Sequence, residues 1–180
     1  MKTDLFRFTL VDVKYQNLIC SWLQQTHVAE WFCGQGLENT IKELDEFIHG
    51  SSIFSYWLAL DQNHPFALLI TSSIDKPSDE LTRWCSESGD AITLDILIGD
   101  PNYLGKGLAH RLIQDFLVSQ FAHVKEVLID PDMANLRAIH VYKKAGFTIV
   151  GEFVPSHSAQ LHYMMRLTMS ELLALDQEGL

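Results

Sequence analysis

The sequence lacks the features that mark a membrane protein or a disulfide-stabilised secreted protein. No uninterrupted apolar run approaches the roughly 18 residues that a membrane span needs. The start of the chain has neither the apolar stretch nor the small-residue cleavage site of a signal peptide. The three cysteines, Cys20, Cys33 and Cys85, are odd in number and form no C-x-x-C pair, which disfavours a disulfide framework or a zinc site. We therefore expect a cytoplasmic protein with free thiols.

Other absences narrow the function further. No repeat, low-complexity tract or linker rich in proline and glycine divides the chain, so we expect one domain over residues 1–180. The histidines form no H-E-x-x-H or related spacing, and we expect no metal. The formal net charge of −10 disfavours nucleic acid and anionic membranes as partners and favours a cationic one. Solubility alone is the other explanation of such a charge.

The hydrophobic pattern alternates between strand and helix periodicities. Thr40 to Glu43 fits a capping box that opens a helix, and Gly146 is placed to end another. The polar stretch 74–90 is predicted to be a long loop or a hairpin excursion. Strands are predicted at 5–11, 53–60, 66–72, 91–98, 125–130, 147–154 and 160–168, and helices at 13–25, 40–49, 105–121 and 134–145 and in the tail. This order predicts an α/β fold with a mixed central sheet of about seven strands, flanked on both faces by about four helices.

The segment between the strand 91–98 and the next helix carries the clearest functional pattern. Gly105 and Gly107 let the backbone approach a ligand without a Cβ atom in the way. The unpaired amides and the positive dipole end of the following helix then favour a phosphate or pyrophosphate. The alternative is that the two glycines only permit a turn. A Walker loop is absent, and a dinucleotide fingerprint would need a third glycine where His110 stands.

Two runs resemble hallmarks of the GNAT superfamily of N-acetyltransferases. Asn102-Tyr-Leu-Gly-Lys-Gly-Leu-Ala109 resembles the acetyl-CoA loop, [Q/R]-x-x-G-x-[G/A], with Asn102 in place of glutamine or arginine. Asn135-Leu-Arg-Ala-Ile-His-Val-Tyr-Lys-Lys-Ala-Gly-Phe147 resembles the second hallmark, N-x-x-A-x-x-x-Y-x-K-x-G-F. The two motifs in this order are more specific than either alone, and they imply a GNAT fold.

Three segments are similar to aminoglycoside 6′-N-acetyltransferases in particular: Thr26–Phe32, Leu94–Gly107 and Ile129–Tyr142. This resemblance implies acetyl-CoA as co-substrate, a small cationic amine as acceptor, a role in antibiotic resistance, and a monomer or homodimer. The stretch 74–90, which would shape the acceptor pocket, matches poorly. Acetyltransferases of hydroxylysine-type siderophore precursors or of polyamines remain alternatives, as does a non-catalytic CoA-binding domain.

The resemblance also implies which residues hold the cofactor. Main-chain groups of the strand 91–98 would pair with pantetheine, and one N–H there would polarise the thioester carbonyl. Asn135 would contact the cofactor from the start of its helix, or serve as the N-cap of that helix. The implied pyrophosphate ligands are the loop amides of Leu104, Gly105, Lys106, Gly107, Leu108 and Ala109, and the strand residues are Ile96, Leu97 and Ile98.

Two residues are implied as catalytic groups. Asp95 would orient the cationic acceptor and take its proton, directly or through water. Its ordinary pKa near ~4 makes it a poor base unless the protein shifts that pKa. Tyr142 would be the general acid, since its ordinary pKa near ~10 is close to that of an alkyl thiol. A tyrosine at this helical spacing is otherwise a core residue.

Three further residues are implied as contacts of the acceptor. Asp130 follows a strand, at the end where α/β sheets place ligands, and would hold an amine. Alternatively, it forms a turn with Pro131. Trp31 and Trp84 would stack against sugar rings, or lie in the core or at the rim.

Overall fold

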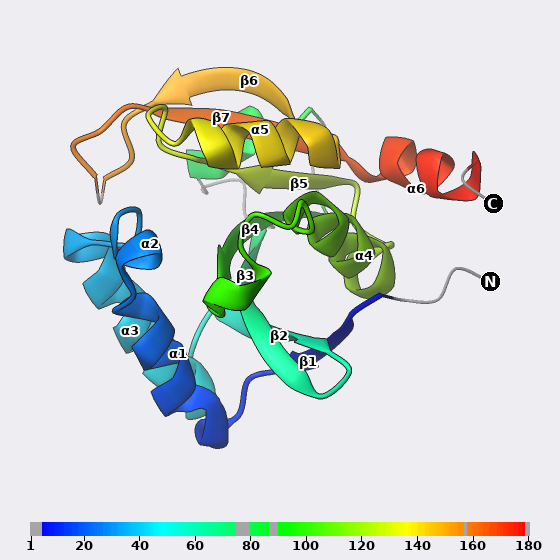
Figure 1. Cartoon of the computed structure of the whole chain (residues 1–180). Coiled ribbons are helices and arrows are strands. Elements are labelled where there is room, and N and C mark those ends of the chain that lie inside the picture. Colours follow the sequence, from blue (N-terminus) through cyan, green and yellow to red (C-terminus); the bar gives the residue numbers. More distant parts are fainter. Residues whose placement is uncertain (1–4, 75–79, 87–89, 157, 179–180) are drawn as a thin grey trace.

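The computed structural model describes residues 5–74, 80–86, 90–156 and 158–178, which form one seven-stranded mixed sheet with helices on both faces (Figure 1). The strands lie in the order β1-β2-β3-β4-β5-β7-β6. They are β1 (Arg7–Leu10), β2 (Phe54–Asp61), β3 (His64–Ile74), β4 (Ala91–Ile98), β5 (Glu126–Ile129), β6 (Thr148–Phe153) and β7 (His162–Thr168). The predicted α/β class and seven-stranded sheet are confirmed.

The described part of the chain contains six α-helices rather than about four; one is the predicted tail helix, and one is a four-residue helix that was not predicted. They are α1 (Gln16–Leu23), α2 (Thr26–Ala29), α3 (Gly34–Ile48), α4 (Ala109–Phe121), α5 (Leu136–Ala145) and α6 (Met169–Glu178). Three short 3-10 helices are η1 (Val13–Tyr15), η2 (Glu80–Trp84) and η3 (Pro101–Tyr103). No helix of the described ranges has the length and apolarity to cross a membrane.

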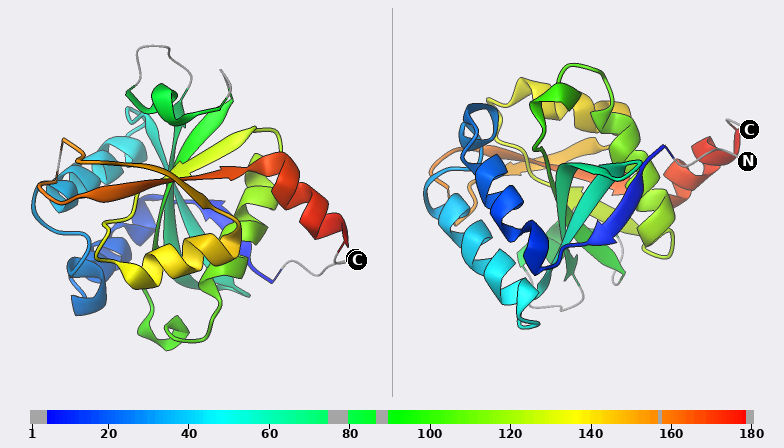
Figure 2. Two further views of the ribbon diagram at one scale, coloured as in Figure 1. Left: turned by 90° about the horizontal axis from the view of Figure 1, so that it is seen from above. Right: turned by 60° about the horizontal axis from the view of Figure 1, so that its bottom comes forward.

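The described residues form three hydrophobic clusters, and the two larger ones lie on opposite faces of the sheet, because successive strand side chains point to opposite faces. Helices α1 and α3 bury Ile19, Trp22 and Leu44 against one face, which also receives Leu97 of β4. Helices α4 and α5 pack on the other face, which receives Leu94 of β4 (Figure 2). The alternation along β4 therefore directs the side chain of residue 95 toward the face that α1 and α3 cover.

Several predicted boundaries differ from the structure. The capping box at residues 40–43 is wrong: Thr40 lies inside α3, and its hydroxyl donates a hydrogen bond to the carbonyl of Gly36 (2.9 Å). Helix α4 begins at Ala109 rather than 105, because the preceding loop has left-handed residues that a right-handed helix excludes. Gly146 ends α5 as predicted, with φ of 114°. Parts of the predicted loop 74–90, at 75–79 and 87–89, lie outside the described residues.

The sheet opens between β4 and β5. These parallel strands pair only where Ala91–Thr93 meets Glu126–Leu128. Beyond Thr93, β4 runs on to Ile98 while paired only with β3, and β5 stays paired with β7 (Figure 1). The opening therefore lies at the carboxyl ends of two parallel strands, where α/β sheets bind ligands.

Candidate active site

The opening exposes the main chain of every second residue of β4. The amide of Gly99 donates to the carbonyl of Phe66 (2.8 Å), one step beyond the pair that Ala67 makes with Ile98. Hydrogen-bonded and non-hydrogen-bonded pairs alternate along an antiparallel ladder. The main-chain groups of Leu97 therefore point toward β3, and those of residues 96 and 98 point toward the opening. The register thus favours Ile96 and Ile98 over Leu97 as partners of an extended ligand.

One of these main-chain groups already has a partner. The Nε2 atom of His27, on α2, lies 2.8 Å from the carbonyl oxygen of Ile98. This contact ties α2 to the end of β4. It leaves the N–H of Ile98 and the main-chain groups of Ile96 on the open side of the strand.

The loop between η3 and α4 is a run of unpaired amides. Gly105 and Gly107 have φ angles of 71° and 68°, and an added Cβ atom at either would meet nothing within 4 Å. The left-handed backbone, rather than crowding, is therefore what requires glycine. Among the described residues, the amides of 105–111 donate to no main-chain carbonyl. The next amide, that of Leu112, donates a hydrogen bond to the carbonyl of Leu108 (2.9 Å). These amides and the dipole of α4 are suited to bind an anion.

Polar contacts anchor this loop at its start. The carboxylate of Asp100 accepts from the main-chain and side-chain nitrogens of Asn102, both at 2.9 Å. Tyr103 stacks on Phe66 with ring centroids 4.3 Å apart, and the ammonium of Lys106 lies 5.3 Å from the Tyr103 ring. Asn102 therefore braces the loop from the place where the family motif has glutamine or arginine.

Helix α5 positions the two predicted site residues of the second motif, Asn135 and Tyr142. The Asn135 side chain accepts a hydrogen bond from the amide of Ala138 (3.0 Å), so the alternative of an N-cap is confirmed, and a cofactor contact stays a prediction. Tyr142 is only 8% exposed and packs beside Phe147. Burial, followed by the charges of Asp95 and Asp130, raises the pKa of Tyr142 well above its ordinary value. The hydroxyl therefore stays protonated throughout the physiological range.

Asp95 lies at the centre of a cluster of carboxylates. Burial raises its pKa to about 7, the charges of Asp130 and Glu43 add to that increase, and His162 opposes it. Burial also raises the pKa of Tyr56, again with the charges of Glu43 and Asp95. The structure therefore brings the two predicted aspartates, Asp95 and Asp130, together and adds Glu43 to them. Glu43 was predicted to be a capping residue, and this prediction is wrong because Glu43 lies inside α3. Only the packing of α3 on the sheet brings it close to β4.

His162 is a second residue that the sequence did not single out. Its Nδ1 atom lies 2.7 Å from the carbonyl oxygen of Asp130 and 3.1 Å from that residue's carboxylate. The Asp130 side chain thus bonds across to β7, while the carbonyl of Pro131 accepts from the amide of Tyr163 (3.0 Å). Only the pairing of β5 with β7 could have revealed this contact.

The two predicted tryptophans lie in different settings. Trp31 follows α2 and is 38% exposed. Trp84, in η2, packs so closely on Gly151 that a Cβ atom there would come within 2.2 Å of the indole ring. The Trp84 ring also lies 5.9 Å from Phe153, and Phe153 lies 6.2 Å from His162. Among the described ring contacts, Phe153 therefore connects Trp84 with His162, the partner of Asp130.

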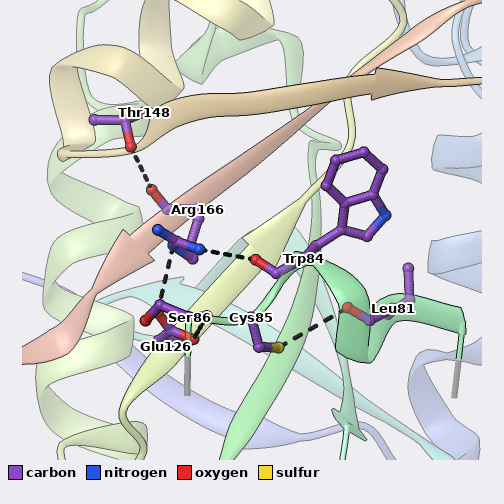
Figure 3. A network of polar contacts seen from close by, with 7 residues as sticks. All are labelled: Leu81, Trp84, Cys85, Ser86, Glu126, Thr148 and Arg166. Carbon is purple, nitrogen blue, oxygen red and sulfur yellow. Dashed lines mark hydrogen bonds and ion pairs between the residues drawn. The ribbon is translucent and has the colours of Figure 1, made fainter. Parts of the chain in front are cut away.

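A buried ion pair anchors the segment that carries Trp84 (Figure 3). The guanidinium of Arg166 lies 3.3 Å from the carboxylate of Glu126 and donates to the carbonyl of Trp84 (2.9 Å). The amide of Ser86 donates to the same carboxylate at 2.9 Å, and its hydroxyl donates there as well. The end of the 74–90 segment is therefore attached to β5 and β7.

The site combines unpaired amides with carboxylates. In the ranges that the structure describes, no three histidine, cysteine, aspartate or glutamate side chains are arranged to bind a metal ion. An amide-lined loop lies at one end of the opening, and a carboxylate cluster lies beside β4.

Known proteins share this architecture. The family model described as "Acetyltransferase (GNAT) domain" matches residues 14–154. Aminoglycoside N(6')-acetyltransferase type 1 of Klebsiella pneumoniae is 28% identical over 139 residues, covering 72% of this chain and 67% of the relative. An aminoglycoside N(6')acetyltransferase from Legionella pneumophila, known from its crystal structure, is 42% identical in sequence and superposes with a TM-score of 0.88. The match covers 97% of this chain and 98% of the Legionella pneumophila chain.

A further solved structure, AAC(6')-Ib in complex with ribostamycin and coenzyme A, is 23% identical with a TM-score of 0.74, covering 92% of this chain and 96% of its own. At that identity it supports the fold alone. The matched family model spans most of the chain, including the loop and both motif helices, and the chain belongs to the GNAT acetyltransferase family.

Proposed function

We propose that this protein transfers an acetyl group from acetyl-CoA to the 6′-amine of an aminoglycoside. The observation that carries the proposal is the carboxylate cluster of Asp95, Asp130 and Glu43 beside an opening that ends in an anion-binding loop. One end suits a diphosphate and the other a polycationic amine. The similarity to the Legionella pneumophila enzyme over nearly the whole chain supports the same acceptor class.

The residues of the opening fit acetyl-CoA, which supplies the acetyl group as a thioester. The amides from Gly105 to Ala109 would bind its pyrophosphate, with Leu104 at the start of the loop and Lys106 adding a charge. Pantetheine would lie along β4 like an additional strand and form hydrogen bonds with the main chain of Ile96 and Ile98. An N–H group on this edge would stabilise the charge that develops on the acetyl oxygen.

Asp95 would accept the proton that the attacking amine loses. An alkylammonium group has a pKa near ~10, about three units above that of the partly buried Asp95 and about six above an ordinary carboxyl group. At about 1.4 kcal/mol per unit, the shift reduces the cost of proton transfer from about 9 to about 4 kcal/mol. The environment that raises this pKa therefore makes Asp95 a usable base.

Tyr142 would assist the leaving sulfur. The raised pKa of Tyr142 lies further above the pKa of a thiol, near ~8.5, than the ordinary pKa of tyrosine does. Proton transfer from the hydroxyl is therefore less balanced than expected. We assign Tyr142 a hydrogen bond to the sulfur, which strengthens as the carbon–sulfur bond breaks and negative charge builds up.

Thiol release tests the proposal. The protein is incubated with acetyl-CoA and a panel of aminoglycosides that includes kanamycin and ribostamycin, and mass spectrometry and NMR locate the acetyl group. We expect thiol release and 6′-acetylation, and loss of both in Asp95→Asn while CoA binding persists. Absence of release with every aminoglycoside would contradict the proposal.

The same assay separates the alternatives. Release with polyamines or hydroxylysine alone would identify a different acceptor. A non-catalytic CoA-binding domain would bind CoA in calorimetry, release no thiol with any amine, and respond to neither Asp95→Asn nor Tyr142→Phe.

A further inference from the structure

Two pairs of a carboxylate and a cation connect β5 with β7. Glu126 pairs with Arg166 at 3.3 Å, and Asp130 pairs with His162 at 3.1 Å. The strand register matches Glu126 with Thr168, and the bridge between Asp132 and His162 continues it. Each pair is therefore a diagonal contact, offset by two residues from the register. The second pair repeats the first, four residues farther along both strands and on the same face.

The two pairs differ in the cation. At the end away from the opening, Glu126 is 4% exposed and its partner is a guanidinium, which is charged at every physiological pH. At the end beside the opening, Asp130 keeps 31% of its side chain exposed and its partner is a histidine, 12% exposed. Histidine is the side chain whose charge changes near neutral pH. The permanent pair attaches a segment of the chain, and the titratable pair lies at the site.

The contacts of His162 determine where its titrating proton lies. The two described partners of Nδ1, the carbonyl and the carboxylate of Asp130, accept a hydrogen bond. Nδ1 therefore carries hydrogen in the neutral and in the charged ring, and the charge comes and goes with the proton on Nε2. The ring consequently keeps its position against Asp130 when it loses its charge.

The described groups around His162 favour the charged ring. Burial is the largest single cause and opposes the charge, but the hydrogen bonds to Asp130 and the charges of Asp130 and Asp132 together outweigh it, so the pKa of His162 is raised. Asp95 on β4 interacts with the ring as well, since His162 lowers the pKa of Asp95. The contact from β6 is the uncharged ring of Phe153.

We propose that the imidazolium of His162 stands in for the ammonium group of the acceptor. It balances Asp130 while the acceptor site is empty, and its Nε2 proton passes to solvent when a cationic amine binds the exposed side of Asp130. This inference rests on the proposed function, because it requires a cationic acceptor. His162 is a positioning residue: it acts on the acceptor through Asp130 and contacts no reacting atom.

The inference determines the sign of a pH effect. A protonated His162 repels the ammonium group of the acceptor, so acceptor affinity rises as pH rises through the pKa of His162. By linkage, the factor by which protonation weakens acceptor binding equals the factor by which bound acceptor raises the acid dissociation constant of His162. Acceptor affinity and spectroscopy must therefore report the same factor, and KM reports that affinity where chemistry is slow relative to acceptor dissociation.

The experiment compares His162→Gln and His162→Arg with wild type. His123→Gln, which alters an exposed histidine beyond α4, is the control. The KM for kanamycin and kcat are measured at saturating acetyl-CoA between about pH 5.5 and 8.5. Because His162→Gln has no proton to lose, we expect the ratio of wild-type to variant KM to fall about tenfold across this range, with kcat changed less than about threefold. His162→Arg keeps its charge, so its KM should be close to the wild-type value at the low end of the range and exceed it increasingly as pH rises.

NMR of the wild-type imidazoles gives a second, activity-independent measurement. The signal that disappears in His162→Gln identifies His162, and we expect kanamycin to lower its pKa by about one unit, matching the tenfold kinetic ratio. Thiol release together with a constant KM ratio and an unmoved His162 titration would overturn this inference and leave the acetyltransferase proposal standing. Without thiol release the function proposal fails, and the NMR titration with kanamycin still decides: a lowered pKa supports the inference, and an unchanged one overturns it.

Discussion

Replacing Asp95 with asparagine should make the protein more stable and less active. Partial burial of the wild-type carboxyl, followed by the charges of Asp130 and Glu43, raises its pKa from 3.8 to about 7 in the folded chain. Ionising it therefore costs more in the folded state than in the unfolded state. Asparagine has nearly the same shape and no charge, so it avoids that cost.

The magnitude follows from the shift. About three pKa units at about 1.4 kcal/mol each set a ceiling of about 4 kcal/mol on the gain in unfolding free energy. We expect about 1–2 kcal/mol, because the effective dielectric inside proteins reduces such costs. Below about pH 4 both states are protonated, so wild type and Asp95→Asn should differ little. The gap should open as pH rises from about 4 to 7, where only the unfolded wild type ionises freely, and level off above 7.

Urea unfolding at pH 4, 5.5, 7 and 8 measures this gap, and thiol release measures activity in parallel. Glu38→Gln, which removes one charge from an exposed position of α3, controls for the change in net charge. Loss of a general base should lower kcat/KM by about 10²–10⁴-fold. A stability gap that does not vary with pH, or is no larger than that of Glu38→Gln, would refute the electrostatic reasoning.

Three other substitutions test the remaining parts of the site. Gly107→Ala, at φ of 68°, should lose about 1 kcal/mol of stability and weaken CoA binding in calorimetry at least about tenfold. The control is Gly50→Ala, at φ of 78°, which should lose stability without a change in CoA binding. Tyr142→Phe should lower kcat about 10–100-fold with little change in KM, and unchanged kcat would remove Tyr142 from the chemistry. Glu126→Gln leaves the partly buried Arg166 without its counter-charge and should lower the free energy of unfolding by about 2–4 kcal/mol in urea titrations, so an unchanged midpoint would contradict the anchoring role.

The local features of the fold were determined by the sequence alone. Alternating apolar residues predicted the strands, and the spacing of the helical faces predicted most of the helices, because both patterns depend on neighbours a few residues apart. Gly105 and Gly107 marked the amide-lined loop for the same reason, since left-handed dihedrals are a property of the residue itself. Local reasoning was wrong at Thr40, where the apolar face of α3 extends the helix through a plausible cap.

The chemistry of the site was decided by tertiary structure. From the sequence Asp95 has an ordinary carboxyl, and only the folded chain removes it from water and brings Asp130, which follows β5, and Glu43 of α3 near enough to raise its pKa. His162 and Asp130 are 32 positions apart in the sequence and come into contact because β7 pairs with β5. The register of β3 with β4 likewise turned the main chain of Leu97 away from the opening. Electrostatic shifts and strand register depend on distances between residues far apart in sequence, and no local pattern encodes those distances.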